Sequence, residues 1–179
     1  MNRAESFRLA LITGGAASGK SRFAEALVTG TGRPRCYIAT ARAWDDEMRA
    51  KIARHRDQRG SGWRLVEAPE ALADALRAVG AEETVLVDCL TMWLSNLLLA
   101  EADLDRAAAD LCGALRDCPA QVVCVTNEVG LGIVPDNALA RRFRDAQGRL
   151  NQTVAGQADL AVAVMAGLPL VLKGHLPDG

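Results

Sequence analysis

The chain has 179 residues, half of which are apolar, and its formal net charge at neutral pH is −1. This length predicts a single domain, residues 1–179, with a sizeable core. The chain lacks the excess of basic residues that is typical of proteins that bind nucleic acids or attach to anionic membranes. We therefore expect neither a nucleic acid nor a membrane as a partner.

The first predicted strand, Arg8–Thr13, leads directly into a glycine-rich motif. Residues 14–21 read GGAASGKS, which fits the pattern G-x-x-x-x-G-K-[ST], and a helix is predicted over Lys20–Val28. Glycines let successive backbone N–H groups turn toward an anion, and the start of the helix adds the positive end of its dipole. We therefore predict that the chain binds a nucleoside triphosphate.

Two side chains of this phosphate loop have distinct predicted roles. Lys20 would reach the β- and γ-phosphates, and the Ser21 hydroxyl would bind Mg²⁺, because a hard cation prefers oxygen ligands. A plain glycine-rich turn is the alternative, and the full motif between a strand and a helix disfavours it. The loop consists of Gly14, Gly15, Ala16, Ala17, Ser18, Gly19, Lys20 and Ser21.

A second predicted strand, Arg35–Thr40, is followed by a predicted helix over Ala43–Arg59. Three apolar residues recur every four positions on one face of this helix, and His55 falls on the same face. The neighbouring arginines are Arg54, Arg56 and Arg59. They would neutralise phosphate oxygens and keep the imidazole uncharged, as a nucleophile at phosphorus requires. The sequence pattern alone favours a structural role over a catalytic one. In that alternative, His55 is partly buried at the end of the helix, and the neighbouring arginines interact with the negative end of the helix dipole.

The later apolar runs alternate with helical patterns. Strands are predicted over Thr84–Asp88, Gln121–Asn127, Ala158–Met165 and Leu170–Lys173, and helices over Pro69–Val79, Leu90–Glu101, Leu104–Arg116 and Asn137–Gln157. Continuous Val, Ile and Leu runs indicate strands covered on both faces. We therefore predict an α/β fold of the P-loop NTPase, RecA-like type, with a mostly parallel central sheet flanked by helices.

Ligands of such a sheet collect beyond the carboxyl ends of the strands, where Thr40, Asp88, Asn127 and Glu128 stand. Asp88 ends a predicted strand, at the position of the acidic residue that holds Mg²⁺ opposite the phosphate loop. Alternatively, Asp88 is the N-cap residue of the next helix. The segment after Asn127, EVGLGIVPDN, is rich in glycine and predicts a substrate loop, but a plain turn has a similar composition.

The five cysteines show no C-x-x-C spacing, and Cys36, Cys89 and Cys124 lie in or beside predicted strands. They predict reduced core thiols of a cytoplasmic protein and disfavour a disulfide frame or a zinc site. No signal peptide is recognised, and the longest apolar stretch, Leu160–Leu172, is too short to span a bilayer.

In six segments, matched in order and spacing, the chain resembles the bifunctional adenosylcobinamide kinase/adenosylcobinamide-phosphate guanylyltransferase family of cobalamin biosynthesis. These segments are TGGAASGKSRFAEAL, YIATA, DDEM…I.RHR, WRLVEAP, VDCLTMWLSNLL and TNEVGLGIVPDNALARRFRDAQGRLNQTVAGQAD. They cover nearly the whole chain. ASGKS is shared by many ATPases, whereas TNEVGLGIVP together with RHR after DDEM is far more restrictive.

The resemblance implies two reactions with ATP, GTP and Mg²⁺. The first phosphorylates the aminopropanol hydroxyl of adenosylcobinamide, and the second transfers GMP from GTP to that phosphate through a guanylylated histidine, which corresponds to His55. It also implies a corrinoid substrate and a homo-oligomer, a trimer. Asn127, Glu128 and the region of Trp93 are candidates for the corrinoid pocket.

The nucleotide contacts implied by the resemblance are the phosphate loop, Ala39, Thr40, Ala41, Arg56, Asp57, Gln58, Arg59, Glu67 and Asp88. A carboxylate suits guanine, because it accepts from the ring N1–H and the exocyclic amine together. The residues do not decide which of Glu67 and Asp88 contacts guanine and which contacts metal or ribose. The chain departs from the family at two positions. Many relatives carry a basic residue where Ala17 stands, and others carry a second histidine in place of Arg54.

Two rival functions remain open at this level. In a single-activity kinase of another metabolite, His55 would be structural, and Arg141, Arg142, Arg144 and Arg149 of the last helix would belong to a phosphate-closing lid. A RecA-like ATPase or nucleotide switch would instead move a partner protein. The near-neutral charge and the absence of charged tails give this second rival little support.

Overall fold

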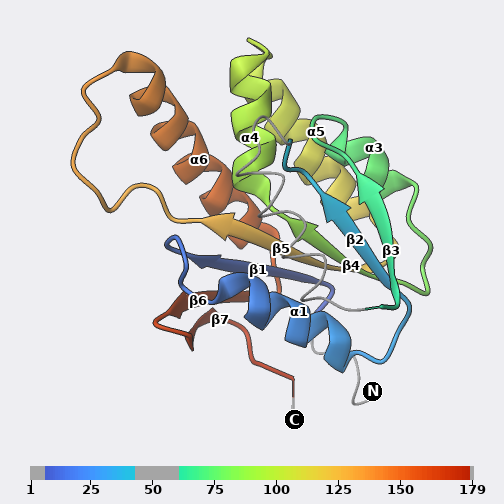
Figure 1. Cartoon of the computed structure of the whole chain (residues 1–179). Coiled ribbons are helices and arrows are strands. Elements are labelled where there is room, and N and C mark those ends of the chain that lie inside the picture. Colours follow the sequence, from blue (N-terminus) through green and yellow to red (C-terminus); the bar gives the residue numbers. More distant parts are fainter. Residues whose placement is uncertain (1–6, 43–60, 178–179) are drawn as a thin grey trace.

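A computed structural model describes residues 7–42 and 61–177. A central sheet separates two layers of helices (Figure 1). Helix α1 (Lys20–Gly30) covers one face, and the other face carries α3 (Leu72–Arg77), α4 (Leu90–Leu99), α5 (Leu104–Asp117) and α6 (Ala138–Gln157). The helix predicted over Ala43–Arg59 lies outside the described residues.

The described sheet has seven strands in the order β3-β2-β4-β5-β1-β6-β7. Their bounds are β1 Leu9–Gly14, β2 Arg35–Ala39, β3 Trp63–Glu67, β4 Thr84–Asp88, β5 Gln121–Asn127, β6 Leu160–Met165 and β7 Leu168–Lys173. Every neighbouring pair is parallel except β6 and β7, which form an antiparallel hairpin. The predicted mostly parallel sheet is therefore confirmed.

The central strands are buried on both faces, which explains their continuous apolar runs. In β1, Leu9 and Leu11 pack with the layer of α3 to α6, whereas Ala10 and Ile12 pack with α1. Fully burying one such aliphatic side chain contributes about 1.5–3 kcal/mol. The apolar core thus fixes the position of β1, and β1 in turn delivers the phosphate loop.

Strand β3 was not among the predicted strands. It lies at the edge of the sheet, and Arg64, Leu65 and Glu67 are exposed, so the segment lacks a continuous apolar run. Arg64 donates to Glu83 at 2.8 and 2.7 Å, and this pairing lowers the pKa of Glu83 although its burial acts in the opposite direction. The charged pair joins β3 to the turn before β4.

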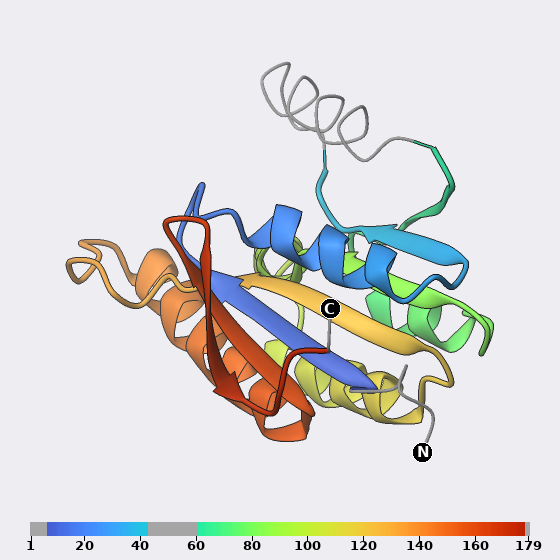
Figure 2. The ribbon, with the colours of Figure 1, turned by 90° about the horizontal axis from the view of Figure 1, so that it is seen from below.

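Strand β7 begins two residues earlier than predicted, at Leu168, and β6 begins two residues later, at Leu160. The last pair of the β6–β7 hairpin is Met165 with Leu168, so the expected break at GLP is a two-residue turn, Ala166–Gly167. Pro169 lies inside β7, where an edge strand tolerates a residue without an N–H donor. All six residues of β7 are exposed. In Figure 2 this hairpin forms the outer edge of the sheet, and its turn lies at the same end as the loop after β1.

Asp159 fastens the start of β1. Its carboxylate accepts from the backbone N–H groups of Arg8 at 2.8 Å and Leu9 at 3.1 Å. Burial alone would raise the pKa of Asp159, but these two donors and the charges of Arg8 and Lys173 together lower it.

Replacement of Asp159 by Asn keeps an oxygen acceptor but removes the charge, so we expect the free energy of unfolding at pH 7 to fall by about 1 kcal/mol. The pKa of Asp159 is lower in the folded state than in the unfolded state. The stability advantage of the wild-type protein over the variant is therefore complete above the ordinary carboxyl pKa of about 4, and it is lost as the pH falls through the pKa of the folded state. Urea unfolding at pH 7 and at pH 2.5 measures it. An equal difference at both pH values would contradict this assignment.

Candidate active site

The candidate site lies at the carboxyl edge of the sheet, where β1 passes into α1. Strand β5 separates β1 from β4, and the strand register pairs Asn127 with Gly14 and Asp88 with Val125. The phosphate loop, Asn127 and Asp88 therefore lie along one edge, where ligands of parallel sheets bind.

Hydrogen bonds fix the directions of two carbonyl groups of the phosphate loop. Gly14 O accepts from Glu128 N at 3.1 Å, and Gly15 O accepts from Ser18 N at 3.4 Å and from Lys20 Nζ at 2.9 Å. Because C=O and N–H groups of a trans peptide point in opposite directions, the N–H groups of these peptides face the other way. The loop thereby offers backbone donors to an anion.

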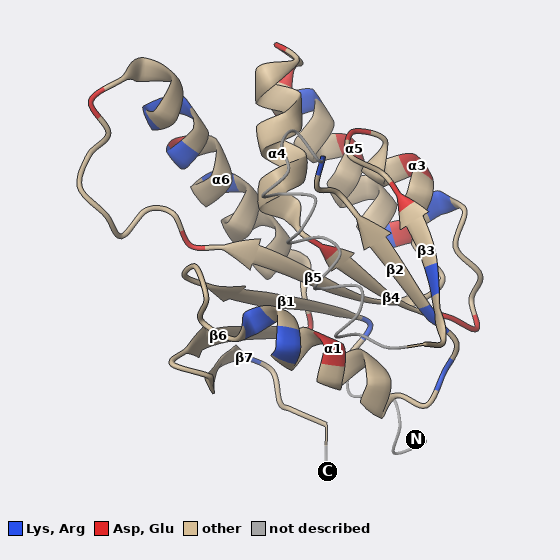
Figure 3. Ribbon diagram, viewed as in Figure 1, with Lys and Arg blue, Asp and Glu red and all other residues tan. Residues whose placement is uncertain are grey.

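No side chain of the described residues caps the N-terminus of helix α1. Its N-cap residue, Gly19, provides no side-chain acceptor, and its first turn has no acidic residue. An anion above the loop would satisfy these donors and interact with the helix dipole. Lys20, the first residue of α1, is 9% exposed, and Figure 3 shows basic residues at the start of this helix.

Two glycines of the motif are required by the structure. A Cβ atom on Gly14 would lie 2.5 Å from Val164 O and 2.6 Å from Ser18 Oγ. Gly19 has a φ of 94°, in the left-handed region that side chains disfavour. Ala17 also has a positive φ, 55°, so the loop alternates in handedness as anion-binding nests do.

Asp88 ends β4 on the same face of the sheet as α1. Its Oδ2 accepts from the Tyr37 hydroxyl at 3.1 Å, a contact that sequence patterns do not reveal. Cys89 is the N-cap residue of α4, so the alternative role of Asp88 as N-cap is wrong. Burial and the Asp88 carboxylate raise the pKa of Cys89 to about 11, whereas Lys20 acts in the opposite direction. This thiol is therefore neutral at physiological pH, and both Asp88 and Lys20 lie near it.

The end of β2 brings three predicted contact residues to this edge. Ala39 pairs with Glu67 on one side and with Asp88 on the other, and Ala41 follows two residues later. Thr40 is fully buried, and its hydroxyl donates to Cys89 O at 2.7 Å and accepts from Cys89 N at 2.8 Å. The Thr40 side chain thus joins the ends of β2 and β4.

Asn127 is held by a buried polar network that the sequence did not predict. Its N–H donates to Thr91 Oγ1 at 2.8 Å, and its carbonyl accepts from Asn151 Nδ2 at 3.1 Å. Thr126 Oγ1 donates to Asn151 Oδ1 at 2.7 Å. Gln147 Nε2 donates to Thr126 Oγ1 at 3.0 Å and to Asn151 Oδ1 at 2.8 Å. The Asn127 Oδ1 atom is buried and has no hydrogen-bond partner among the described residues.

Several predicted site residues lie outside the described residues. These are His55, Arg56, Asp57, Gln58 and Arg59, and Arg54 lies with them. Their segment begins after Arg42, three residues beyond the carboxyl end of β2. The chain therefore leaves the candidate edge of the sheet immediately before the residues that carry His55.

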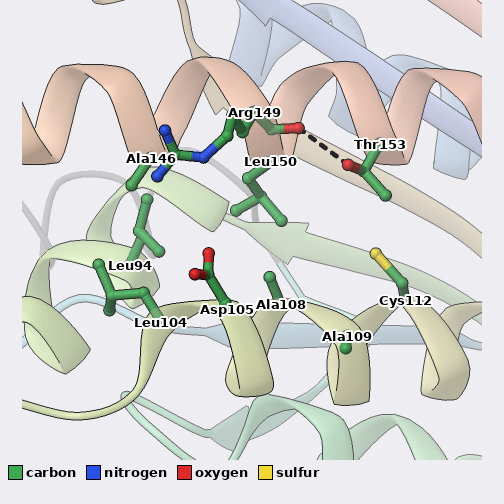
Figure 4. Close-up of a pocket in the computed structure, with 10 residues that line it drawn as sticks. All are labelled: Leu94, Leu104, Asp105, Ala108, Ala109, Cys112, Ala146, Arg149, Leu150 and Thr153. Carbon is green, nitrogen blue, oxygen red and sulfur yellow. Dashed lines mark hydrogen bonds between the residues drawn. The ribbon is translucent and has the colours of Figure 1, made fainter.

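The Trp93 side chain is buried in the core. It is 2% exposed and its indole N–H donates to Glu70 O at 2.9 Å, so Trp93 itself belongs to the core, and the predicted role of its region in the corrinoid pocket stays a prediction. A separate groove of about 270 Å³ lies between α4, α5 and α6 (Figure 4). It is mostly apolar, with Asp105 and Arg149 at its rim, and none of its lining residues belongs to the site above.

All five cysteines are buried and unpaired, which confirms their predicted role as core thiols. Residues 7–42 and 61–177 contain no cluster of three or more His, Cys, Asp or Glu side chains arranged to hold a metal ion. Within the same ranges, none of the helices combines the length and the hydrophobicity of a transmembrane span.

A family model described as cobinamide kinase / cobinamide phosphate guanyltransferase matches residues 10–172. Over 168 residues the chain is 47% identical to the bifunctional adenosylcobalamin biosynthesis protein CobP of Pseudomonas aeruginosa, covering 92% of this chain and 97% of that protein. Over 179 residues it is 44% identical to the bifunctional adenosylcobalamin biosynthesis protein CobU of Salmonella typhimurium, covering 91% and 98%.

Solved structures share the fold at low sequence identity. The flagellar accessory protein FlaH of Methanocaldococcus jannaschii has a TM-score of 0.54 at 13% identity, covering 96% of this chain and 80% of that one. A second solved structure, an ATPase domain, has a TM-score of 0.50 at 12% identity, covering 91% and 70%. These similarities confirm the predicted RecA-like P-loop fold.

Removal of the Lys20 ammonium group tests the phosphate loop. A hydrogen bond to a charged partner is worth roughly 1.5–3 kcal/mol, so we expect Lys20→Ala to weaken binding of a fluorescent GTP analogue about 10- to 150-fold. The matched control is Lys173→Ala, since Lys173 also donates to backbone carbonyl groups but does so at the end of α6. Equal affinities of the two variants would contradict the assigned site.

Proposed function

The chain belongs to the cobinamide kinase / cobinamide phosphate guanyltransferase family, and we propose that it catalyses both of these reactions in the cytoplasm. In the first, the γ-phosphoryl group of ATP or GTP moves to the aminopropanol hydroxyl of adenosylcobinamide. In the second, GMP moves from GTP to the resulting phosphate, which gives adenosylcobinamide-GDP and pyrophosphate. The observation that carries this proposal is a preformed phosphate loop on a chain that matches the family over nearly its whole length.

One phosphate loop serves both reactions in this proposal. Its backbone N–H groups and Lys20 hold the β- and γ-phosphates of the bound triphosphate. In the kinase reaction they stabilise the charge that develops as the γ-phosphoryl group leaves, and in the second reaction they stabilise the departing pyrophosphate. The loop thus stays in place while the attacked phosphorus changes.

His55 is the proposed nucleophile of the second reaction. A neutral imidazole nitrogen attacks the α-phosphorus, the bond to pyrophosphate breaks, and GMP remains on the ring as a phosphoramidate. A phosphate oxygen of adenosylcobinamide phosphate then attacks the same phosphorus, and the nitrogen–phosphorus bond breaks. Arg56 and Arg59 would neutralise the phosphate oxygens, with Asp57 and Gln58 as further nucleotide contacts.

Ser21 and Asp88 fit a magnesium ion, because a hydroxyl and a carboxylate are hard oxygen donors and leave positions for phosphate oxygens and water. When bound, the ion neutralises charge on the phosphates. Asp88 lies two strands from β1 in the sheet order, about 10 Å, whereas Glu67 lies four strands away, about 19 Å. We therefore assign Asp88 to the metal and Glu67 to guanine.

Covalent labelling tests the proposed nucleophile. After incubation with α-labelled GTP and Mg²⁺, denatured protein should retain labelled GMP that is stable in alkali and lost in acid, as expected of a phosphoramidate. His55→Ala should abolish the label, and His175→Ala, which changes the only other histidine, should retain it. An unlabelled wild-type protein would favour a single-activity kinase or a nucleotide switch.

We also propose that the chain forms a homo-oligomer, a trimer. Supporting this, Met165, Leu168, Leu170 and Leu172 expose more than half of their surface along the edge hairpin. Isolated exposed apolar residues are common, but a contiguous row on an edge strand is a typical site of association.

Light scattering after gel filtration tests this assembly. We expect a mass three times that of the 19.0 kDa chain, and we expect Leu170→Lys to reduce it because the charge would be buried in the interface. Leu65→Lys is the matched control, an exposed leucine in β3 at the opposite edge of the sheet. A monomeric wild-type protein would contradict the proposal, as would an unchanged mass of Leu170→Lys.

A further inference from the structure

The turn between β6 and β7 lies against the phosphate loop, although the two are far apart in the sequence (Figures 1 and 2). The Gly167 N–H group donates to Ser18 O at 2.9 Å. A Cβ atom on Gly19 would lie 3.2 Å from Gly167 Cα. The backbone of the hairpin therefore packs directly on the backbone of the loop.

This hydrogen bond determines the direction of one peptide group. Ser18 O and Gly19 N–H belong to the same planar trans peptide, in which they point in opposite directions. Because Gly167 holds Ser18 O on the hairpin side, Gly19 N–H points toward the concave side of the loop. If this peptide turned over, a carbonyl oxygen would face the phosphate and repel it.

We propose that Gly167 is a positioning residue for the triphosphate, acting through the Ser18–Gly19 peptide. The turn requires its present conformation, since Ala166 and Gly167 have φ values of 52° and 77°. Alanine tolerates the left-handed region at modest cost, whereas a β-branched residue there is a strong outlier. Gly167 lies outside the phosphate-loop motif and outside the strand ends that the proposed function uses. Its positioning role rests on triphosphate binding at the loop.

A matched pair of variants tests it. Gly167→Val forces the turn out of the left-handed region, and Gly32→Val imposes the same change at a glycine with a φ of 68° just after α1. In both cases no atom of the described residues beyond the two adjacent ones lies within 4 Å of the new Cβ atom. We expect similar losses of melting temperature, but an approximately tenfold weaker affinity for GTP only in Gly167→Val, the size of one lost hydrogen bond. In turnover, kcat/KM for GTP should fall by at least the same factor in Gly167→Val alone, because the Gly19 N–H group would contact the phosphates in both the ground state and the transition state.

Similar affinities of the two valine variants would overturn the proposal. If Gly167→Val fails to fold, a backbone ester at position 167 removes only the N–H group and should still weaken GTP binding several-fold, and unchanged binding by the ester would also overturn it. A wild-type protein that does not bind GTP would instead refute the proposed function, so the two failures are distinguishable.

Discussion

The proposed function depends on the direction of the peptide groups in the phosphate loop. Three carbonyl groups of the loop, those of Gly14, Gly15 and Ser18, accept hydrogen bonds from three different places: the segment after β5, the loop itself together with Lys20, and the β6–β7 turn. The corresponding N–H groups face the opposite side. Since the fold holds these donors before a ligand binds, little reorganisation is needed when a triphosphate arrives.

The strand order explains how two reactions can share this loop. With β5 between β1 and β4, the buried Asn127 network lies between the loop and Asp88, and β2 and β3 extend the same edge toward Glu67. In the proposed function, a triphosphate held by its β- and γ-phosphates would extend its nucleoside along the strand ends. Under this proposal the attacked phosphorus depends on the nucleophile, a corrinoid hydroxyl at the γ-position or His55 at the α-position.

The predictability of each element follows from its burial. Strands β4 and β5 were predicted at their observed bounds because both faces are covered, which produces uninterrupted apolar runs. The edge strand β3 was missed, since Arg64 and Glu67 interrupt its pattern. Contacts such as Tyr37 to Asp88 and Gly167 to Ser18 join distant segments and have no local signal. The role of His55 rests on family resemblance, and its segment lies outside the described residues.

The most direct test of this account is the equilibrium affinity of the His55→Ala variant, which cannot form the guanylylated intermediate, for GMP, GDP and GTP, measured by calorimetry in the presence of Mg²⁺. If the preformed backbone donors and Lys20 provide most of the binding energy, affinity should rise at least about tenfold with each added phosphate, the worth of one charge-assisted hydrogen bond. Equal affinities for GMP and GTP would contradict it, because recognition would then depend on the nucleoside and not on the loop.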